Sequence, residues 1–189
     1  ENLETEIIKI REINRKLLHD LDNEETNRKE LETRASMDQL TGTYNRRAGL
    51  ELLQKNIFLA ERNSLPLSIC FIDLDGLKRI NDNFGHEVGD QYILAALEGL
   101  KANIRKSDYI FRYGGDEFIL ILYNCSNPQA ERIIEQARSS LDKLREKERY
   151  PFKVHFSAGV ANYRKNQSME KLIKTADEKM YLEKQTKQG

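Results

Sequence analysis

Over residues 1–36 the apolar side chains recur at alternating steps of four and three residues, which is the spacing of a heptad seam on one helix. The seam consists of Leu3, Ile7, Ile10, Leu17, Leu21, Leu31 and Ala35, with Asn14, Glu24 and Arg28 at its polar positions. A single inward Asn commonly fixes the register and the number of strands in parallel coiled coils. Because a lone helix of this kind has no core of its own, it needs a partner to bury its apolar stripe. We therefore expect a parallel two-stranded coiled coil; the alternative is a helix that folds back on its own domain.

Beyond Ser36 the apolar pattern changes to that of a mixed α/β domain. Helical periodicity predicts helices over residues 45–62, 88–105, 128–147 and 169–184. Short apolar runs predict strands over residues 67–73, 109–113, 118–123 and 154–160. The second and third of these strands are separated by Gly114-Gly115, which predicts a hairpin. The chain is therefore expected to contain a dimerising helix in residues 1–36 and one α/β domain in residues 37–189.

Charge and composition restrict the classes of partner. The chain has 31 Lys and Arg residues and 31 Asp and Glu residues, so no net field draws it to nucleic acid or to an anionic membrane surface. No apolar run approaches the roughly 18 residues of a membrane span, and the N-terminus lacks a signal-peptide pattern. We expect neither a nucleic-acid partner nor a membrane segment in this fragment. Because the chain begins at Glu1 rather than Met, we also expect that an upstream sensor domain has been removed.

The two cysteines, Cys70 and Cys125, lack the spacing of a metal site. Cys70 lies inside an apolar run, where a thiol behaves as a small apolar side chain. The pattern favours buried free thiols and a reducing, cytoplasmic location.

A group of polar side chains follows the strand expected at residues 67–73. The group comprises Asp73, Asp75, Lys78, Asn81 and Asp82. Ligands collect at strand ends in α/β sheets, and carboxylates suit a hard cation such as Mg²⁺, which prefers oxygen ligands. The pattern is equally that of an ordinary polar turn that caps the next helix.

The expected hairpin carries the sequence Gly114-Gly115-Asp116-Glu117-Phe118. Glycines permit positive φ and leave no Cβ in the way, so we expect backbone N–H groups there to approach a phosphate. If the hairpin pairs beside the strand at residues 67–73, Asp116 and Glu117 meet Asp73 around a shared metal. The chain has no GxxxxGK[ST] string, so a triphosphate would be held without a P-loop. A plain tight turn is the alternative.

Four stretches of the chain carry a resemblance to a known family. They are Asp38 to Arg47 (DQLTGTYNRR), similar to DxLTGxxNR; Phe71 to Asp90 (FIDLDGLKRINDNFGHEVGD), similar to FxDxDxFKxxNDxxGHxxGD with Leu77 in place of Phe; the GGDEF string itself; and Ala176 to Tyr181 (ADEKMY), similar to ADxxMY. Together they resemble the GGDEF family of diguanylate cyclases over residues 37 to about 185. The resemblance implies a nucleotidyl cyclase-like palm, with a mostly antiparallel central sheet flanked by helices.

The resemblance also implies an activity and the residues that carry it. The activity would be the condensation of two GTP into cyclic di-GMP by a homodimer with Mg²⁺ or Mn²⁺, and the alternative is an inactive module that binds GTP or cyclic di-GMP as a receptor. The implied metal ligands are Asp73, the Leu74 carbonyl, Asp116 and Glu117; the implied catalytic residues are Asp116, Glu117 and Lys78; and the implied substrate contacts are Asn81, Asp90, Gly114, Gly115 and Lys184. The family's later arginine, in a GRN-like context, has no clear counterpart in residues 184–189, where Lys187 is a possible substitute.

Arg105-Lys106-Ser107-Asp108 resembles the family's RxxD product-inhibition site. An arginine can grip guanine or phosphate through two hydrogen bonds, and an acid can accept from the guanine N–H groups. A second arginine from the next helix is often part of such a site. Arg138 and Arg132 are both candidates, the pattern does not decide between them, and Arg138 is carried forward as the candidate residue. Alternatively, Arg105 complements a helix C-terminus and Asp108 begins a turn.

Overall fold

The computed structural model describes residues 9, 11, 14–21, 23–24, 35–146 and 152–188. The chain divides into two units, Glu1–Met37 and Asp38–Gly189. The described residues of the first unit from 9 to 24 are helical, and Leu17 and Leu21 expose 53% and 60% of their surface. The seam positions Leu3, Ile7, Ile10, Arg28 and Leu31 lie outside the described residues. The coiled coil therefore stays a prediction. The exposure of Leu17 and Leu21 is what a seam without its partner helix would show.

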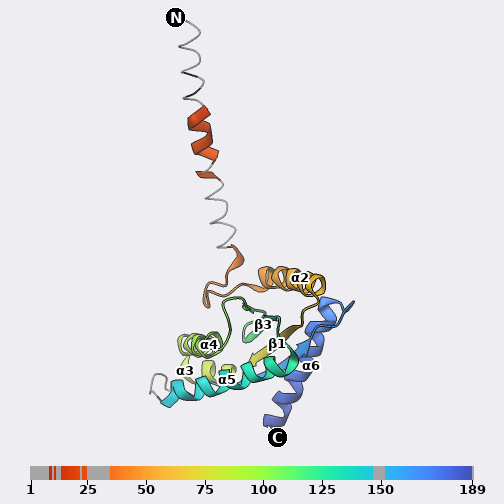
Figure 1. Cartoon of the computed structure of the whole chain (residues 1–189). Helices are drawn as coiled ribbons and strands as arrows, with labels where there is room; N and C mark the ends of the chain where they lie inside the picture. Colours follow the sequence, from red (N-terminus) through yellow and green to blue (C-terminus); the bar gives the residue numbers. More distant parts are fainter. Residues whose placement is uncertain are drawn as a thin grey trace, which may run out of the picture. The chain divides into compact units, whose positions relative to one another are not determined.

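The second unit is built on one antiparallel sheet of four strands in the order β2-β3-β1-β4 (Figure 1). The strands are β1 (Leu67–Leu74), β2 (Tyr109–Arg112), β3 (Glu117–Tyr123) and β4 (Phe156–Asn162). All four strands were predicted, and β4 lies two residues later than expected, since its prediction covered residues 154–160. The α/β fold class with an antiparallel sheet is confirmed.

Helices cover both faces of this sheet, which explains why β1 is buried along its whole length. The first face, which includes Cys70 and Ile72, packs against α3 (Leu77–Phe84), α4 (His86–Lys101) and α5 (Asn127–Glu146). The opposite face, which includes Ile69 and Phe71, packs against α2 (Arg46–Asn63) and α6 (Met169–Gln188). Because strand side chains alternate between faces, an odd-numbered residue such as Asp73 belongs to the α2 and α6 side.

The helix α3 was not predicted. It has eight residues, begins after Gly76 at φ 80° and ends at Gly85 at φ 86°. A segment this short shows barely two turns of periodicity, so its polar residues suggested only a turn. The left-handed Gly85 then lets the chain start α4 at once, and α4 begins at His86 and ends at Lys101, whereas we expected residues 88–105.

Cys70 and Cys125 are both free and buried, as predicted. Among the described residues, no helix combines the length and apolar character that crossing a membrane requires.

Candidate active site

Three acidic residues meet where β1 ends and β3 begins. Asp73 is the cross-strand partner of Glu117 in the antiparallel register, so their side chains lie on the same face of the sheet. The Leu74 backbone N–H donates to the Asp116 carbonyl at 3.0 Å, which fastens the hairpin to the end of β1. The Leu74 side chain is buried in the core, so only its backbone is available to the site. The structure therefore brings together the acids that the sequence placed 43 residues apart (116 − 73).

The electrostatics of these acids show a local excess of negative charge. Burial raises the pKa of Asp73, Lys184 partly offsets this rise, and the carboxylates of Asp116 and Asp75 add to it. Burial likewise raises the pKa of Glu117, and the charges of Asp116 and Asp73 raise it further. Asp73 and Glu117 therefore resist ionisation, first because they are partly buried and further because neighbouring carboxylates are charged.

Lys184 contacts the acidic group directly from α6. Its Nζ donates to Asp73 Oδ1 at 2.6 Å, and both side chains are largely buried, with 29% and 11% exposed. Burial alone would lower the pKa of Lys184, but the hydrogen bond and charge of Asp73 outweigh burial, so this pKa is raised. Lys184 was expected to contact substrate, and the structure places its ammonium beside a predicted metal ligand.

The acids fit a divalent cation by their chemistry. Within residues 35–146 and 152–188, no three His, Cys, Asp or Glu side chains are already grouped as ligands around one point. The donors at the site are nevertheless carboxylate oxygens, which Mg²⁺ and Mn²⁺ prefer. A cation placed there would also relieve the repulsion that raises the pKa values of Asp73 and Glu117.

The glycine turn does not use the positive φ that glycine permits. Neither Gly114 nor Gly115 has a positive φ, and the Gly114 N–H donates to the Glu117 carbonyl at 3.2 Å. The approach of a phosphate to the backbone of this turn stays a prediction. A Cβ at position 114 would meet the carboxylate of Glu117, so a side chain there would require the flexible end of Glu117 to move. Gly115, by contrast, faces open space.

A cavity of about 420 Å³ adjoins Asp116. It is lined by Leu77, Lys78, Asn81, Asp82, His86, Gly89, Asp90, Ile93, Arg112, Gly115 and Asp116. A Cβ on Gly89 would lie 1.8 Å from Asn81 Oδ1, so the absence of a side chain at position 89 makes room for Asn81. The structure thus gathers three predicted residues, Lys78, Asn81 and Asp90, around one cavity beside the acids.

A second cavity, of about 610 Å³, lies next to Lys184. It is lined by Asp75, Gly76, Arg79, His155, Lys184 and Lys187. The Tyr92 hydroxyl donates to the Asp75 carbonyl at 2.7 Å and thereby ties α4 to the loop after β1. This cavity is rich in cationic side chains, and Arg79 was not predicted to belong to the site.

Arg112 is a further site residue that the sequence analysis missed. Its guanidinium donates to the Gly115 carbonyl at 2.7 Å and 3.1 Å and to Asp38 Oδ1 at 3.1 Å. Asp38 also accepts from the Thr41 N–H at 2.9 Å. Burial would raise the pKa of Asp38, but the hydrogen bonds from Thr41 and Arg112 lower it overall. The sequence offered a signal for each residue separately, since Arg112 stands just before the glycine pair and Asp38 opens the DxLTGxxNR-like motif. Their pairing could not be read from the sequence, because the two residues lie 74 positions apart.

The residues of the proposed inhibitory site form a local turn. The Arg105 backbone N–H donates to Asp108 Oδ2 at 2.9 Å, and burial raises the pKa of Asp108, with the charge of Arg105 opposing. Both residues act electrostatically on Cys125, two residues before α5.

Arg138 contacts β4 and α6. It lies eleven residues after the start of α5 (138 − 127), which is about 16 Å along the helix. Its guanidinium is engaged by the Phe156 carbonyl at 2.8 Å and by Glu183 at 2.7 Å. The place of Arg138 in the inhibitory site therefore stays a prediction. Arg132, whose Nε donates to the Pro128 carbonyl at 3.3 Å, lies nearer that end of α5.

With the sheet and its acidic site described, comparison with known proteins defines the class. Residues 35–189 match the family model for the diguanylate cyclase GGDEF domain. This match covers well over half of the chain, so the chain belongs to the GGDEF domain family.

Individual relatives agree with this assignment. The chain is 38% identical over 150 residues to diguanylate cyclase DosC of Escherichia coli strain K12, covering 78% of this chain and 33% of DosC. It is 32% identical over 168 residues to diguanylate cyclase DgcM of the same strain, covering 89% of this chain and 40% of DgcM. Among solved structures, the GGDEF domain of DgcB from Caulobacter crescentus in complex with c-di-GMP is similar with a TM-score of 0.74 and 25% identity, over 80% of this chain and 89% of that one. The chain thus spans about a third of the length of DosC.

Proposed function

We propose that this chain is the catalytic unit of a diguanylate cyclase, which joins two GTP into cyclic di-GMP and releases pyrophosphate. The observation that carries the proposal is the cross-strand placement of Asp73 opposite Glu117, with Asp116 fastened to the end of β1. An inactive receptor module would have no need to keep three mutually repelling acids beside a nucleotide-sized cavity.

The cavity next to Asp116 suits a guanine base. A carboxylate such as Asp90 accepts from guanine N1–H and N2–H, while the Asn81 amide serves O6 or N3. Both residues line the same cavity of about 420 Å³ as Lys78. An adenine presents a donor where guanine presents O6 and lacks the N2 amine, so we expect ATP to compete poorly with GTP.

The triphosphate is assigned to the cationic cavity. Lys184, Lys187 and Arg79 line it, and they supply the positive charge that the missing GRN-like arginine would have contributed. Lys78, in the neighbouring cavity, lies within the loop and helix that separate Asp73 from Asn81. Lysine side chains of this kind act as point charges that neutralise phosphate oxygens.

Asp73, Asp116 and Glu117 are assigned as ligands of Mg²⁺ or Mn²⁺, with the Leu74 carbonyl as a further oxygen. When bound, the cation supplies Lewis-acid activation of the attacking 3′-hydroxyl and of the α-phosphate. The chain's own residues hold the reactants in place and neutralise charge on the phosphates, which is the main contribution of protein groups to transfers of this type.

The product's two-fold symmetry requires two domains that face each other. One domain holds one GTP, so we propose a homodimer in which each protomer presents one nucleotide to the other. The helix in residues 1–36 would raise the effective concentration of the two halves and transmit the state of an upstream sensor. Arg105 and Asp108 are proposed to bind cyclic di-GMP as an inhibitor. Two buried free thiols and a GTP substrate suit a reducing cytoplasm.

The proposal is tested by incubating the protein with GTP and Mg²⁺ and separating the products by chromatography. We expect cyclic di-GMP and pyrophosphate from the wild type, and we expect no product from Asp116→Asn. Retained GTP binding without product in a confirmed dimer would instead support the receptor alternative. Equal incorporation of adenine from an ATP and GTP mixture would refute the assigned guanine selectivity.

A further inference from the structure

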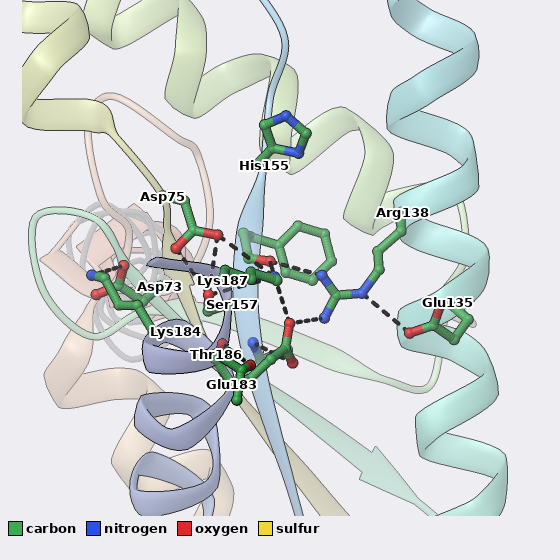
Figure 2. A network of polar contacts seen from close by, with 12 residues as sticks. Asp73, Asp75, Glu135, Arg138, His155, Ser157, Glu183, Lys184, Thr186 and Lys187 are labelled. Carbon is green, nitrogen blue, oxygen red and sulfur yellow. Dashed lines mark hydrogen bonds and ion pairs between the residues drawn. The ribbon is translucent and has the colours of Figure 1, made fainter. Parts of the chain in front are cut away.

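The outer edge of β4 is closed by charged side chains from α5 and α6 (Figure 2). Arg138 donates to the Phe156 carbonyl at 2.8 Å, and Glu183 accepts from the Ala158 N–H at 3.3 Å. These two side chains also pair with each other at 2.7 Å. The pair therefore connects α5, the edge of β4 and the last turns of α6 through hydrogen bonds to fixed backbone groups.

The next residue of α6 after this anchor is Lys184. Consecutive residues of a helix point about 100° apart, so fixing the direction of the Glu183 side chain also fixes that of Lys184. Lys184 Nζ lies 2.6 Å from Asp73 Oδ1, at the end of the neighbouring strand β1. Figure 2 shows the two contacts on adjacent sides of α6, with Arg138 approaching from α5 and Asp73 from the sheet.

The Arg138–Glu183 contact is shielded enough to act as a constraint. The two side chains are 25% and 29% exposed, and the Arg138 guanidinium lies over the Phe156 ring at 4.6 Å. Its other acidic partner, Glu135, is 73% exposed at 3.2 Å, and exposed ion pairs contribute little. Lys187, one turn after Glu183, adds a second contact to the Phe156 carbonyl at 2.7 Å.

We propose that Arg138 and Glu183 are positioning residues that orient α6 so that Lys184 is held against Asp73 and beside the cationic cavity. Any effect of these residues on catalysis rests on the proposed function. The placement of Lys184 against Asp73 does not depend on that function. Neither residue lines the two cavities of the site. Glu183 also pairs with Lys187, which lines the cationic cavity, but the effect on Asp73 is assigned to Lys184.

The first test measures the placement of Lys184 without any turnover. The full chain is treated briefly with an amine-acylating reagent, and the labelling rate of each lysine is followed by mass spectrometry. In Arg138→Ala and Glu183→Gln we expect the labelling rate of Lys184 to rise about tenfold, because its ammonium is released from Asp73. Lys174, which is 75% exposed, provides the internal reference and should label at an unchanged rate.

Two controls separate positioning from general loosening. Glu135→Gln removes the exposed partner of Arg138 and should leave the labelling of Lys184 unchanged. Thermal unfolding of each variant shows whether it is folded, and Glu183→Gln, which is nearly isosteric, serves if Arg138→Ala does not fold. An unchanged rate at Lys184 in folded Glu183→Gln would overturn the proposal.

The second test is a double-mutant cycle on nucleotide affinity. Calorimetry with a GTP analogue whose α,β linkage cannot be cleaved should give about tenfold weaker binding for Lys184→Ala and for Arg138→Ala. Because Arg138 acts through Lys184, the double variant should bind no more weakly than Lys184→Ala alone. Losses that multiply would show independent roles and contradict the proposal. If the wild type does not bind the analogue, the proposed function fails, while the labelling test still decides the placement of Lys184.

Discussion

At the residue scale, Glu117 carries an electrostatic strain that its function would explain. It lies opposite Asp73 on a neighbouring strand, and like charges in such cross-strand positions destabilise a sheet. Among the described residues no Lys or Arg forms an ion pair with Glu117, and burial together with the charges of Asp116 and Asp73 raises its pKa. A carboxylate kept where its charge is unfavourable is typical of a binding site.

Glu117→Gln is therefore expected to stabilise the protein while removing activity. Removing the charge relieves the repulsion, so the Tm in the absence of divalent cations should rise by about 1–3 °C. The pKa of Glu117 in the folded state lies above its unfolded value of about 4.3. The gain in stability from Glu117→Gln is therefore complete at a pH above the folded-state pKa, and it vanishes at a pH below the unfolded-state pKa. Thermal unfolding at several pH values measures this. A lower Tm for Glu117→Gln at neutral pH would contradict the electrostatic account.

At the element scale, the hairpin between β2 and β3 is held from outside by Arg112. The guanidinium contacts both the Gly115 carbonyl and the Asp38 carboxylate. In this ion pair the side chain of Arg112 is 17% exposed and that of Asp38 is 23% exposed. The turn that carries Asp116 is thus fastened to the segment that enters the domain. A shift of that segment would therefore reach the turn through the Arg112 side chain as well as through the backbone contact between Arg112 and Tyr44.

Arg112→Ala should lower both stability and turnover. The change leaves the Asp38 carboxylate partly buried without its cation, which costs about 1–3 kcal/mol. The pKa of Asp38 is lowered in the folded state, so its contribution to stability is present above the unfolded pKa of about 3.9 and is lost as the pH falls through the folded pKa. Denaturant unfolding at neutral and acidic pH checks this, with the exposed Arg47→Ala as control. An equal free energy of unfolding for Arg112→Ala and wild type at neutral pH would rule the account out.

The elements that the sequence predicted are those with strong periodicity. The strand β1 and the helix α5 are long and uniform in their apolar pattern, so the pattern alone predicted both elements. The helix α3 escaped because eight residues between two glycines show too little pattern. The convergence of Asp73 and Glu117 was predicted only on the condition that the hairpin pairs beside β1, which the register confirms. The torsion angles of Gly114 and the 74-residue pairing of Arg112 with Asp38 depend on tertiary contacts.

At the scale of the whole molecule, the account requires two protomers. Leu17 and Leu21 are more than half exposed on the N-terminal helix, so each should be buried by a second copy. Replacing both with Glu should convert the dimer to a monomer and abolish turnover together, which light scattering and product chromatography measure on the same samples. Full turnover by a monomer would overturn the requirement for this helix.

The proposed product inhibition also belongs to this scale, because the Arg105–Asp108 turn is separate from the acidic site in sequence. Arg105→Ala should relieve inhibition by cyclic di-GMP and leave the initial rate within about twofold, since its side chain contributes to no part of the acidic site. Initial rates at increasing product concentration test this, with Lys106→Ala as the matched control. An inhibition curve identical to that of the wild type would exclude Arg105 from the inhibitory site.

The central claim is that Asp73, Asp116 and Glu117 jointly bind a divalent cation beside a nucleotide. Electron paramagnetic resonance of Mn²⁺, titrated with protein in the presence of the uncleavable GTP analogue, measures this binding directly. We predict that Asp73→Asn, Asp116→Asn and Glu117→Gln each weaken Mn²⁺ binding about tenfold or more. Asp142→Asn, at an exposed acid that pairs with Lys153, should bind Mn²⁺ as the wild type does. Equal Mn²⁺ affinity in the wild type and all three acid variants would contradict the account.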